Sequence, residues 1–148
     1  MLKGIDPLLG PELLAILRAM GHGDEIAIVD ANFPASSSSR MLVRLDGVGC
    51  PEAVRAILSV LPLDTFVANA AFRMQVVDNP AETPPITLEF ERLLGAAGYR
   101  GAIEAIERFS FYERARNAYA VVATGERRYW GNLILKKGAI PPNDRIDS

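Results

Sequence analysis

The sequence predicts an α/β protein in which helices pack on the faces of a mixed β-sheet. Segments with apolar residues at helical spacing alternate with short, continuous apolar runs typical of buried strands. The 148 residues are 49% hydrophobic and 23% charged, which is the composition of a globular protein with a core. This length suits a single compact domain. We assign the domain to residues 1–140 and expect a polar, frayed tail over residues 141–148.

The first predicted helix covers residues 11–20, where Pro11 suits the first helical position and Gly21 a left-handed stop. The continuous apolar run from Ile26 to Val29 predicts a strand buried on both faces. Asp30 follows directly, so the strand delivers a carboxylate at its carboxyl end.

The next segment alternates again between strand and helix patterns. Residues 33–39 contain a proline and four serines and predict an irregular loop. Strands are expected over residues 41–45 and 72–77, on either side of a helix over residues 51–61 that Pro51 opens.

The second half begins with a helix over residues 86–97, closed by Gly98. Ile103 and Ile106 then lead into residues 107–109, where a short strand that includes Arg108 is expected. The remaining expected elements are a helix over residues 111–118, with Ser110 as N-cap and Glu113 three residues later, and a final pair of strands over residues 119–123 and 132–135 around a turn over residues 125–131.

Composition argues against several classes of function. No apolar run approaches the 18 or more residues of a membrane span, and residues 1–10 lack the apolar core of a secretory signal. The single cysteine, Cys50, and the single histidine, His22, cannot form an internal disulfide or a multi-histidine metal site. We expect a cytoplasmic protein without a metal or a membrane partner.

A nucleic-acid partner is also disfavoured. The net charge is −2, and Lys and Arg are scattered apart from one small group. We interpret that group as a solvated surface or a subunit contact. Its members are Arg127, Arg128, Lys136 and Lys137.

Two candidate residues for chemistry lie at opposite ends of the first strand. His22 is flanked by glycines that expose its imidazole, which can act as acid or base near neutral pH. The alternative is a helix C-terminal residue that faces the helix dipole. Asp30 lies where α/β sheets open ligand crevices, and its alternative role is to cap the following loop.

Further candidates lie late in the chain. Arg108, in the expected strand, needs a solvent face, a ligand or an ion-pair partner. Residues Tyr129, Trp130, Gly131 and Asn132 combine two aromatics, a glycine and an amide. This combination suits a sugar, because CH faces pack on aromatic rings while hydroxyls meet the amide. A hairpin turn with a core tryptophan is the alternative.

Six separated motifs then carry a family resemblance. They are Met1-Leu2-Lys3 with Pro11-Glu12-Leu13-Leu14; Met20-Gly21-His22-Gly23-Asp24-Glu25; Val29-Asp30-Ala31 with Phe33-Pro34; Arg108-Phe109 with Phe111-Tyr112-Glu113-Arg114-Ala115; Thr124-Gly125-Glu126-Arg127; and Gly131-Asn132 with Leu135-Lys136-Lys137-Gly138. Through them the chain resembles the L-fucose mutarotase branch of the fucose mutarotase and ribose pyranase family over about residues 1–140.

The resemblance implies the single-domain fold of that family and a cofactor-independent isomerase. Such an enzyme interconverts the α and β anomers of L-fucose or a related free monosaccharide. The resemblance also implies a ring-shaped homo-oligomer with sites near subunit contacts. His22 matches the acid–base histidine, Asp30 and Arg108 match sugar-contacting positions, and Trp130-Gly131-Asn132 match an aromatic-Gly-Asn tripeptide. Arg108 favours the fucose branch.

Two departures from the family pattern bear on sugar preference more than on reaction type. Trp130, preceded by Tyr129, stands where the family typically has tyrosine. Asn32 and the serine run follow Asp30 where relatives often carry histidine. The alternatives to an L-fucose mutarotase are a ribose pyranase-like isomerase, a non-catalytic sugar-binding or transport-accessory protein, and an interaction scaffold.

Opening a hemiacetal ring needs a base for the anomeric hydroxyl and an acid for the ring oxygen. We predict His22 as one proton carrier and Asp30, a water or a phenol as the other, while Arg108 and Asn132 hold ring hydroxyls. The ends of the intervening strand are roughly 13 Å apart. Either the loop over residues 21–25 folds back, or different subunits supply the two residues.

Overall fold

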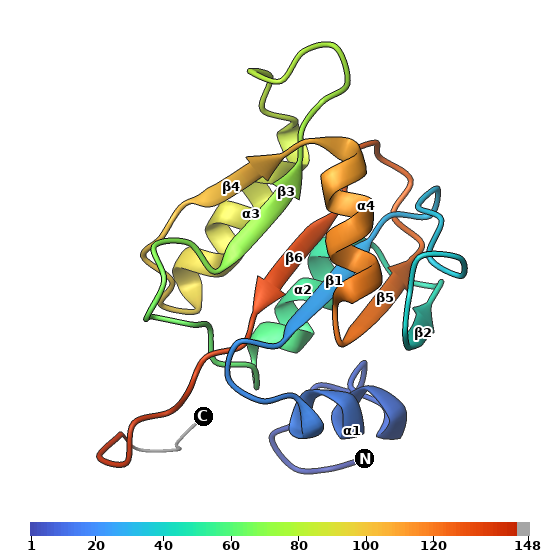
Figure 1. Cartoon of the computed structure of the whole chain (residues 1–148). Coiled ribbons are helices and arrows are strands. Elements are labelled where there is room, and N and C mark those ends of the chain that lie inside the picture. The colour runs from blue at the N-terminus through green and yellow to red at the C-terminus, as the bar shows by residue number, and fades with distance from the viewer. Residues whose placement is uncertain (145–148) are drawn as a thin grey trace.

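The computed structural model describes residues 1–144, in which helices cover both faces of a six-stranded mixed sheet (Figure 1). The strands lie in the order β2-β5-β1-β6-β3-β4, and β6 runs antiparallel to its neighbours β1 and β3. The predicted fold class is confirmed. In chain order the elements are α1 Pro11–Ala19, β1 Glu25–Val29, β2 Leu42–Leu45, α2 Cys50–Leu58, β3 Ala71–Met74, α3 Pro85–Ala96, β4 Ile103–Ile106, α4 Arg108–Asn117, β5 Ala120–Thr124 and β6 Leu133–Lys136.

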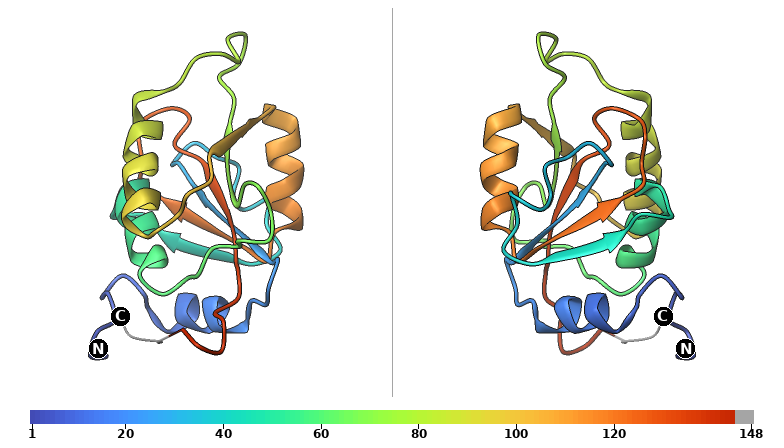
Figure 2. Two further views of the ribbon diagram at one scale, coloured as in Figure 1. Left: turned by 90° about the vertical axis from the view of Figure 1, so that its left-hand side faces the viewer. Right: turned by 90° about the vertical axis from the view of Figure 1, so that its right-hand side faces the viewer.

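The sheet separates two apolar cores. Helices α2 and α3 lie on one face, and α4 lies on the other (Figure 2). Alternate residues of β1 serve the two cores: Ile26 and Ile28 pack on the side of α2 and α3, and Ala27 and Val29 pack on the side of α4. All four are fully buried, which confirms that the apolar run is a strand covered on both faces.

The expected hairpin near the C-terminus is wrong. Strands β5 and β6 do not pair, because β1 lies between them, parallel to β5 and antiparallel to β6. Residues 125–132 therefore form a long loop that crosses from one side of β1 to the other at the carboxyl end of the strand, where Asp30 lies. Two adjacent apolar runs look like a hairpin in sequence, since sequence alone does not show a third strand inserted between them.

The expected strand at Arg108 and the N-cap at Ser110 are also wrong. β4 ends at Ile106, and Arg108 is the first residue of α4. The N-cap is Glu107, whose carboxylate accepts hydrogen bonds from Phe109 N and Ser110 N at 2.9 and 3.1 Å. A carboxylate at this position accepts hydrogen bonds from two helix N–H groups and interacts favourably with the positive end of the helix dipole.

Smaller corrections concern element ends. Gly21 does not provide the left-handed stop of α1; the left-handed glycine is Gly23, with φ of +89°, whereas Gly98 closes α3 as expected with φ of +87°. β3 ends at Met74, and α2 begins at Cys50 and ends at Leu58. Of the expected tail over residues 141–148, residues 145–148 lie outside the described part of the chain.

Within residues 1–144, no helix is long and apolar enough to cross a membrane. The same residues contain no group of three or more His, Cys, Asp or Glu that could hold a metal ion.

Candidate functional site

A cleft of about 140 Å³ is lined by residues at the carboxyl end of β1 and at the start of α4. It brings together five of the seven residues that the sequence singles out, from three separate segments of the chain. Four further residues of its lining were not predicted. The predicted lining residues are Asp30, Arg108, Tyr129, Trp130 and Asn132, and the additional ones are Asn32, Phe33, Met74 and Tyr112.

Asp30 and Asn132 hold each other at the base of this cleft. Asp30 N donates to Asn132 Oδ1 at 2.9 Å, and Asn132 Nδ2 donates to Asp30 Oδ2 at 3.1 Å. Asn32 N donates to the other carboxylate oxygen, so Asp30 also caps the loop that follows it. Burial of the side chain raises the pKa of Asp30, although hydrogen bonds from Asn32 and Asn132 oppose this shift. A carboxyl group with a raised pKa is suited to proton transfer.

Replacing Asn132 with alanine is expected to raise the pKa of Asp30 further, because the side-chain hydrogen bond that lowers it is removed. The variant also leaves the buried N–H of Asp30 without its acceptor, at a cost of about 1–3 kcal/mol of stability. Carboxyl ¹³C NMR titration and urea unfolding measure these two effects. An unchanged or lowered pKa of Asp30 in this variant would contradict the assigned hydrogen bond.

Arg108 has no ion-pair partner among residues 1–144, so a structural ion pair within this range does not explain its position. Its guanidinium carbon lies 4.6 Å from the centre of the Phe109 ring. Its Nε is buried and has no hydrogen-bond acceptor among the described residues. A buried donor without an acceptor is uncommon, and Arg108 lines the cleft.

The aromatic residues of the 125–132 loop both line the cleft. Tyr129 is 74% exposed, whereas Trp130 is half-buried against the core on the side of α4. Trp130 has a φ of 67°, in the left-handed region that costs a non-glycine residue about 1–3 kcal/mol. The surrounding loop must therefore hold this residue in place.

Gly131, although predicted as a site residue, does not line the cleft. A Cβ at this position would lie 2.9 Å from Glu126 Cγ and 3.1 Å from Ile86 Cδ1. Glycine is needed here for close packing behind the loop.

His22 lies at the opposite end of β1 from the cleft. Gly23 N donates to Lys137 O, just beyond the end of β6, whereas Asn132 at the start of β6 contacts Asp30. Since β1 and β6 are antiparallel, these contacts place His22 and Asp30 at opposite ends of the sheet. The loop between Gly21 and Glu25 thus does not fold back to the cleft within one chain.

The imidazole of His22 contacts two residues that sequence reasoning missed. His22 Nε2 lies 2.9 Å from Asp64 Oδ1, and the Phe66 ring centre is 5.2 Å from the imidazole. Hydrogen bonds from Phe66 N and from His22 hold the pKa of Asp64 below its usual range. An ionised Asp64 accepts a hydrogen bond from Nε2–H, which leaves Nδ1 as the basic nitrogen of a neutral ring.

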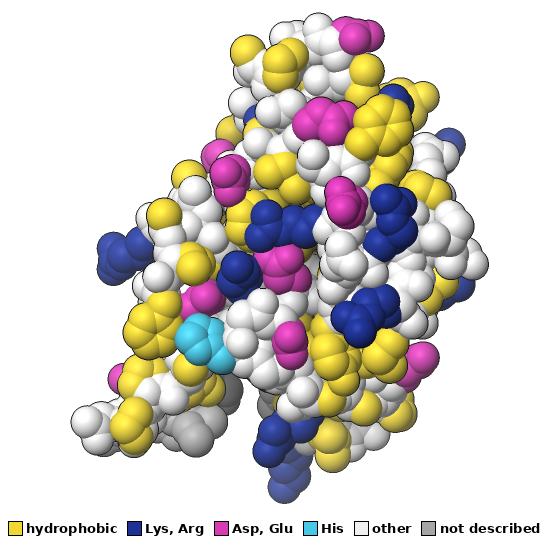
Figure 3. All heavy atoms as spheres, viewed as in Figure 1, with side chains coloured by type: hydrophobic (Ala, Val, Ile, Leu, Met, Phe, Trp, Pro, Cys, Tyr) yellow, Lys and Arg dark blue, Asp and Glu magenta, His cyan; other side chains and the backbone are white. Residues whose placement is uncertain are grey.

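Two members of the small basic group make contacts within the chain. Lys137 Nζ donates to the carbonyls of Leu17 and Met20 at the end of α1, and Arg128 pairs with Glu126. On the face shown in Figure 3, Lys and Arg side chains are interspersed with acidic and apolar ones. This arrangement differs from the continuous basic surface typical of nucleic-acid binding.

Residues 3–140 match the model of the RbsD / FucU transport protein family. The chain is 50% identical over 148 residues to the fucose mutarotase of Homo sapiens, with 96% of each chain covered. It superposes with a TM-score of 0.89 on the fucose mutarotase of Streptococcus pneumoniae in complex with L-fucose, at 41% identity, covering 95% of this chain and 100% of that one. RbsD of Bacillus subtilis complexed with D-ribose shares the fold, with a TM-score of 0.73 at 22% identity over 95% of this chain and 99% of that one.

Proposed function

This chain belongs to the RbsD / FucU transport protein family, and we propose that it is a mutarotase that interconverts the α and β anomers of L-fucose. One observation carries the proposal: the cleft joins the Asp30–Asn132 pair, two aromatic rings and the buried Arg108 Nε, which has no acceptor within residues 1–144. Hydroxyl groups of a sugar provide acceptors for Arg108, and its CH faces pack on Tyr129 and Trp130. The relatives named fucose mutarotase favour L-fucose as the sugar.

The active site is shared between copies of the chain. A cleft of about 140 Å³ is smaller than the roughly 300–1,000 Å³ of typical small-molecule sites. His22 is 43% exposed and stands beside Phe66, which is 79% exposed, at the far end of β1. In a ring-shaped homo-oligomer a neighbouring copy contributes its own His22 to the cleft and encloses the sugar.

The chemistry requires two proton carriers on the same sugar. The neighbour's His22 removes the anomeric hydroxyl proton through Nδ1, and Asp30, in its protonated form, donates to the ring oxygen. The carbon–oxygen bond of the ring opens to give the aldehyde. After rotation about the bond to the aldehyde carbon, closure on the opposite face, with the two proton transfers reversed, gives the other anomer. Arg108 and Asn132 hold hydroxyl groups during this step.

We also propose that the protein is cytoplasmic. The single cysteine is buried and unpaired, which fits a reducing compartment. The catalytic unit is the domain of residues 1–140, nearly all of which matches the family model.

Saturation-transfer NMR on equilibrated sugars tests the proposed function. Adding the protein is expected to accelerate anomer exchange of L-fucose more than that of D-ribose, relative to a sample without protein. Faster exchange of D-ribose would assign the chain to a pyranase-like activity. Saturable L-fucose binding without faster exchange would assign it to the sugar-binding or transport-accessory class.

A further inference from the structure

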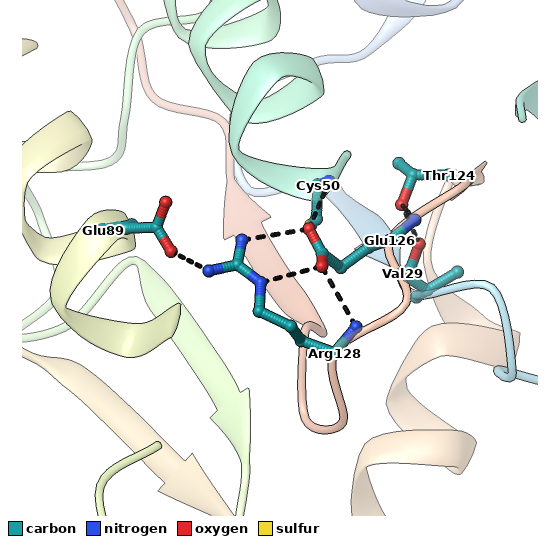
Figure 4. Close-up of polar contacts among 6 residues, drawn as sticks. All are labelled: Val29, Cys50, Glu89, Thr124, Glu126 and Arg128. Carbon is teal, nitrogen blue, oxygen red and sulfur yellow. Dashed lines mark hydrogen bonds and ion pairs between the residues drawn. The ribbon is translucent and has the colours of Figure 1, made fainter. Parts of the chain in front are cut away.

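The loop over residues 125–132 carries three cleft residues but is held from behind by a buried carboxylate that does not reach the cleft. Glu126 is 7% exposed. Its Oε1 accepts from Arg128 N at 3.1 Å and Arg128 Nε at 2.9 Å, and its Oε2 accepts from Arg128 Nη2 at 3.2 Å and Cys50 N at 3.3 Å (Figure 4). Four donors thus converge on one carboxylate.

These contacts attach the loop to three other elements. Cys50 is the first residue of α2, and the second arm of Arg128 pairs with Glu89 on α3 (Figure 4). The backbone of Glu126 accepts a hydrogen bond from Ala31 N at 2.8 Å, next to Asp30. The loop is therefore fixed on one side to α2 and α3 and on the other side to the segment that carries the cleft carboxylate.

Glu126 lines a different cavity from the one that holds the candidate site. This second cavity, of about 470 Å³, lies between α2, α3 and the loop, and none of its lining residues is shared with the cleft. A direct role of Glu126 in proton transfer to a sugar in the cleft is thus excluded by its position. Its contacts with Arg128 hold the pKa of Glu126 below its usual range, so the carboxylate is ionised at neutral pH.

The packing behind Trp130 points in the same direction. Trp130 has a left-handed backbone, and Gly131 allows the Glu126 Cγ to approach to 2.9 Å from where a Cβ would stand. An unfavourable backbone conformation persists only where its surroundings determine it. The groups that surround this turn from the rear are the Glu126 side chain, Arg128 and Ile86.

We propose that Glu126 is a positioning residue, which through Arg128 holds Trp130 and Asn132 in the geometry that binds the sugar. The inference rests on the proposed function for its ligand but not for its effect on the loop. Replacing Glu126 retains every cleft residue but removes the contacts that fix the loop, so Trp130 and Asn132 shift and sugar affinity falls. A displacement of such groups by about 1 Å is enough to weaken their action up to roughly 100-fold.

The sole tryptophan of the chain, Trp130, provides a direct readout of the loop. In Glu126→Ala, its fluorescence is expected to shift to longer wavelength and to become more accessible to acrylamide. Titration with L-fucose is expected to show a dissociation constant raised roughly 10- to 100-fold. Glu126→Gln, which keeps the shape and one acceptor oxygen, is expected to lie between the alanine variant and the natural protein.

Two further variants separate positioning from general destabilisation. Tyr99→Phe removes a hydroxyl that bonds Ala70 N and Ala102 O, away from the loop, and is expected to lower stability without changing Trp130 emission. Glu89→Gln weakens only the outer contact of Arg128, by removing the negative charge, and is expected to have a small effect. If Glu126→Ala does not fold, Glu126→Gln supplies the comparison with Tyr99→Phe.

The proposal is overturned if Trp130 in the folded Glu126 variants shows the same emission and acrylamide quenching as in the natural protein. The same holds if Tyr99→Phe changes these signals as much as Glu126→Gln does. Quenching is measured without sugar, so it decides the role of Glu126 in the loop even if the natural protein does not bind L-fucose. That last result would contradict the proposed function alone.

Discussion

Replacing His22 with alanine is expected to slow the catalysed anomer exchange of L-fucose by roughly 10²- to 10⁴-fold, which is the usual contribution of a positioned acid or base. Fold and assembly should be retained, because the imidazole is 43% exposed and contributes no core packing. Saturation-transfer NMR gives the exchange rate, and circular dichroism and light scattering establish that the variant is folded and assembled.

His22→Gln is the matched variant for this experiment. A glutamine amide can still donate to Asp64 in place of Nε2 but cannot exchange a proton near neutral pH. We expect it to be as inactive as the alanine variant. Normal exchange of L-fucose in His22→Gln would show that His22 acts by packing or hydrogen bonding rather than by proton transfer.

Mixing His22→Ala subunits with Asp30→Asn subunits is expected to restore activity that neither variant has alone. Each shared site takes His22 from one copy and Asp30 from its neighbour. Random assembly of equal amounts therefore leaves about a quarter of the sites intact. The two variants are expressed together, or dissociated and reassembled, and the exchange rate of L-fucose is compared with that of each variant alone.

This complementation distinguishes a shared site from a site within one chain. If one chain supplied both residues, every site in the mixed assembly would lack one of them, and no activity would return. Full activity of dissociated natural monomers would contradict the shared site independently. Reassembled His22→Ala subunits alone are the control for rates that rise merely through handling.

Much of the fold could be predicted from local patterns. β1 was recognisable because four consecutive apolar residues must be buried on both sides, and all four are. The helices α1 and α3 were recognisable from helical spacing and from Pro11 and Gly98 at their ends. The failures lie where pairing is not local: β5 and β6 are adjacent in sequence, but β1 separates them in the sheet.

The site was predictable to the extent that its residues have unusual chemistry for their local positions. Asp30 follows a buried strand, and Trp130 and Asn132 stand in a short polar and aromatic segment. Asp64 carries no such signal, because an aspartate in a loop is ordinary and its contact with His22 spans 42 residues. Glu126 stands out in the sequence only as part of a family motif, since sequence does not show that it is buried.

The sequence by itself determined the fold class, the resemblance to a sugar isomerase family, and most of the residues that now line one cleft. Each of these depends on residue type and short-range spacing, which the chain carries directly. Only the tertiary structure decided that His22 and Asp30 lie at opposite ends of β1 and that Arg108 begins a helix, with no acceptor for its Nε in the described part of the chain. The same is true of the buried contacts that Glu126 makes behind the aromatic loop. These features arise from contacts between distant segments, because the order of strands in the sheet sets which ends of which elements meet.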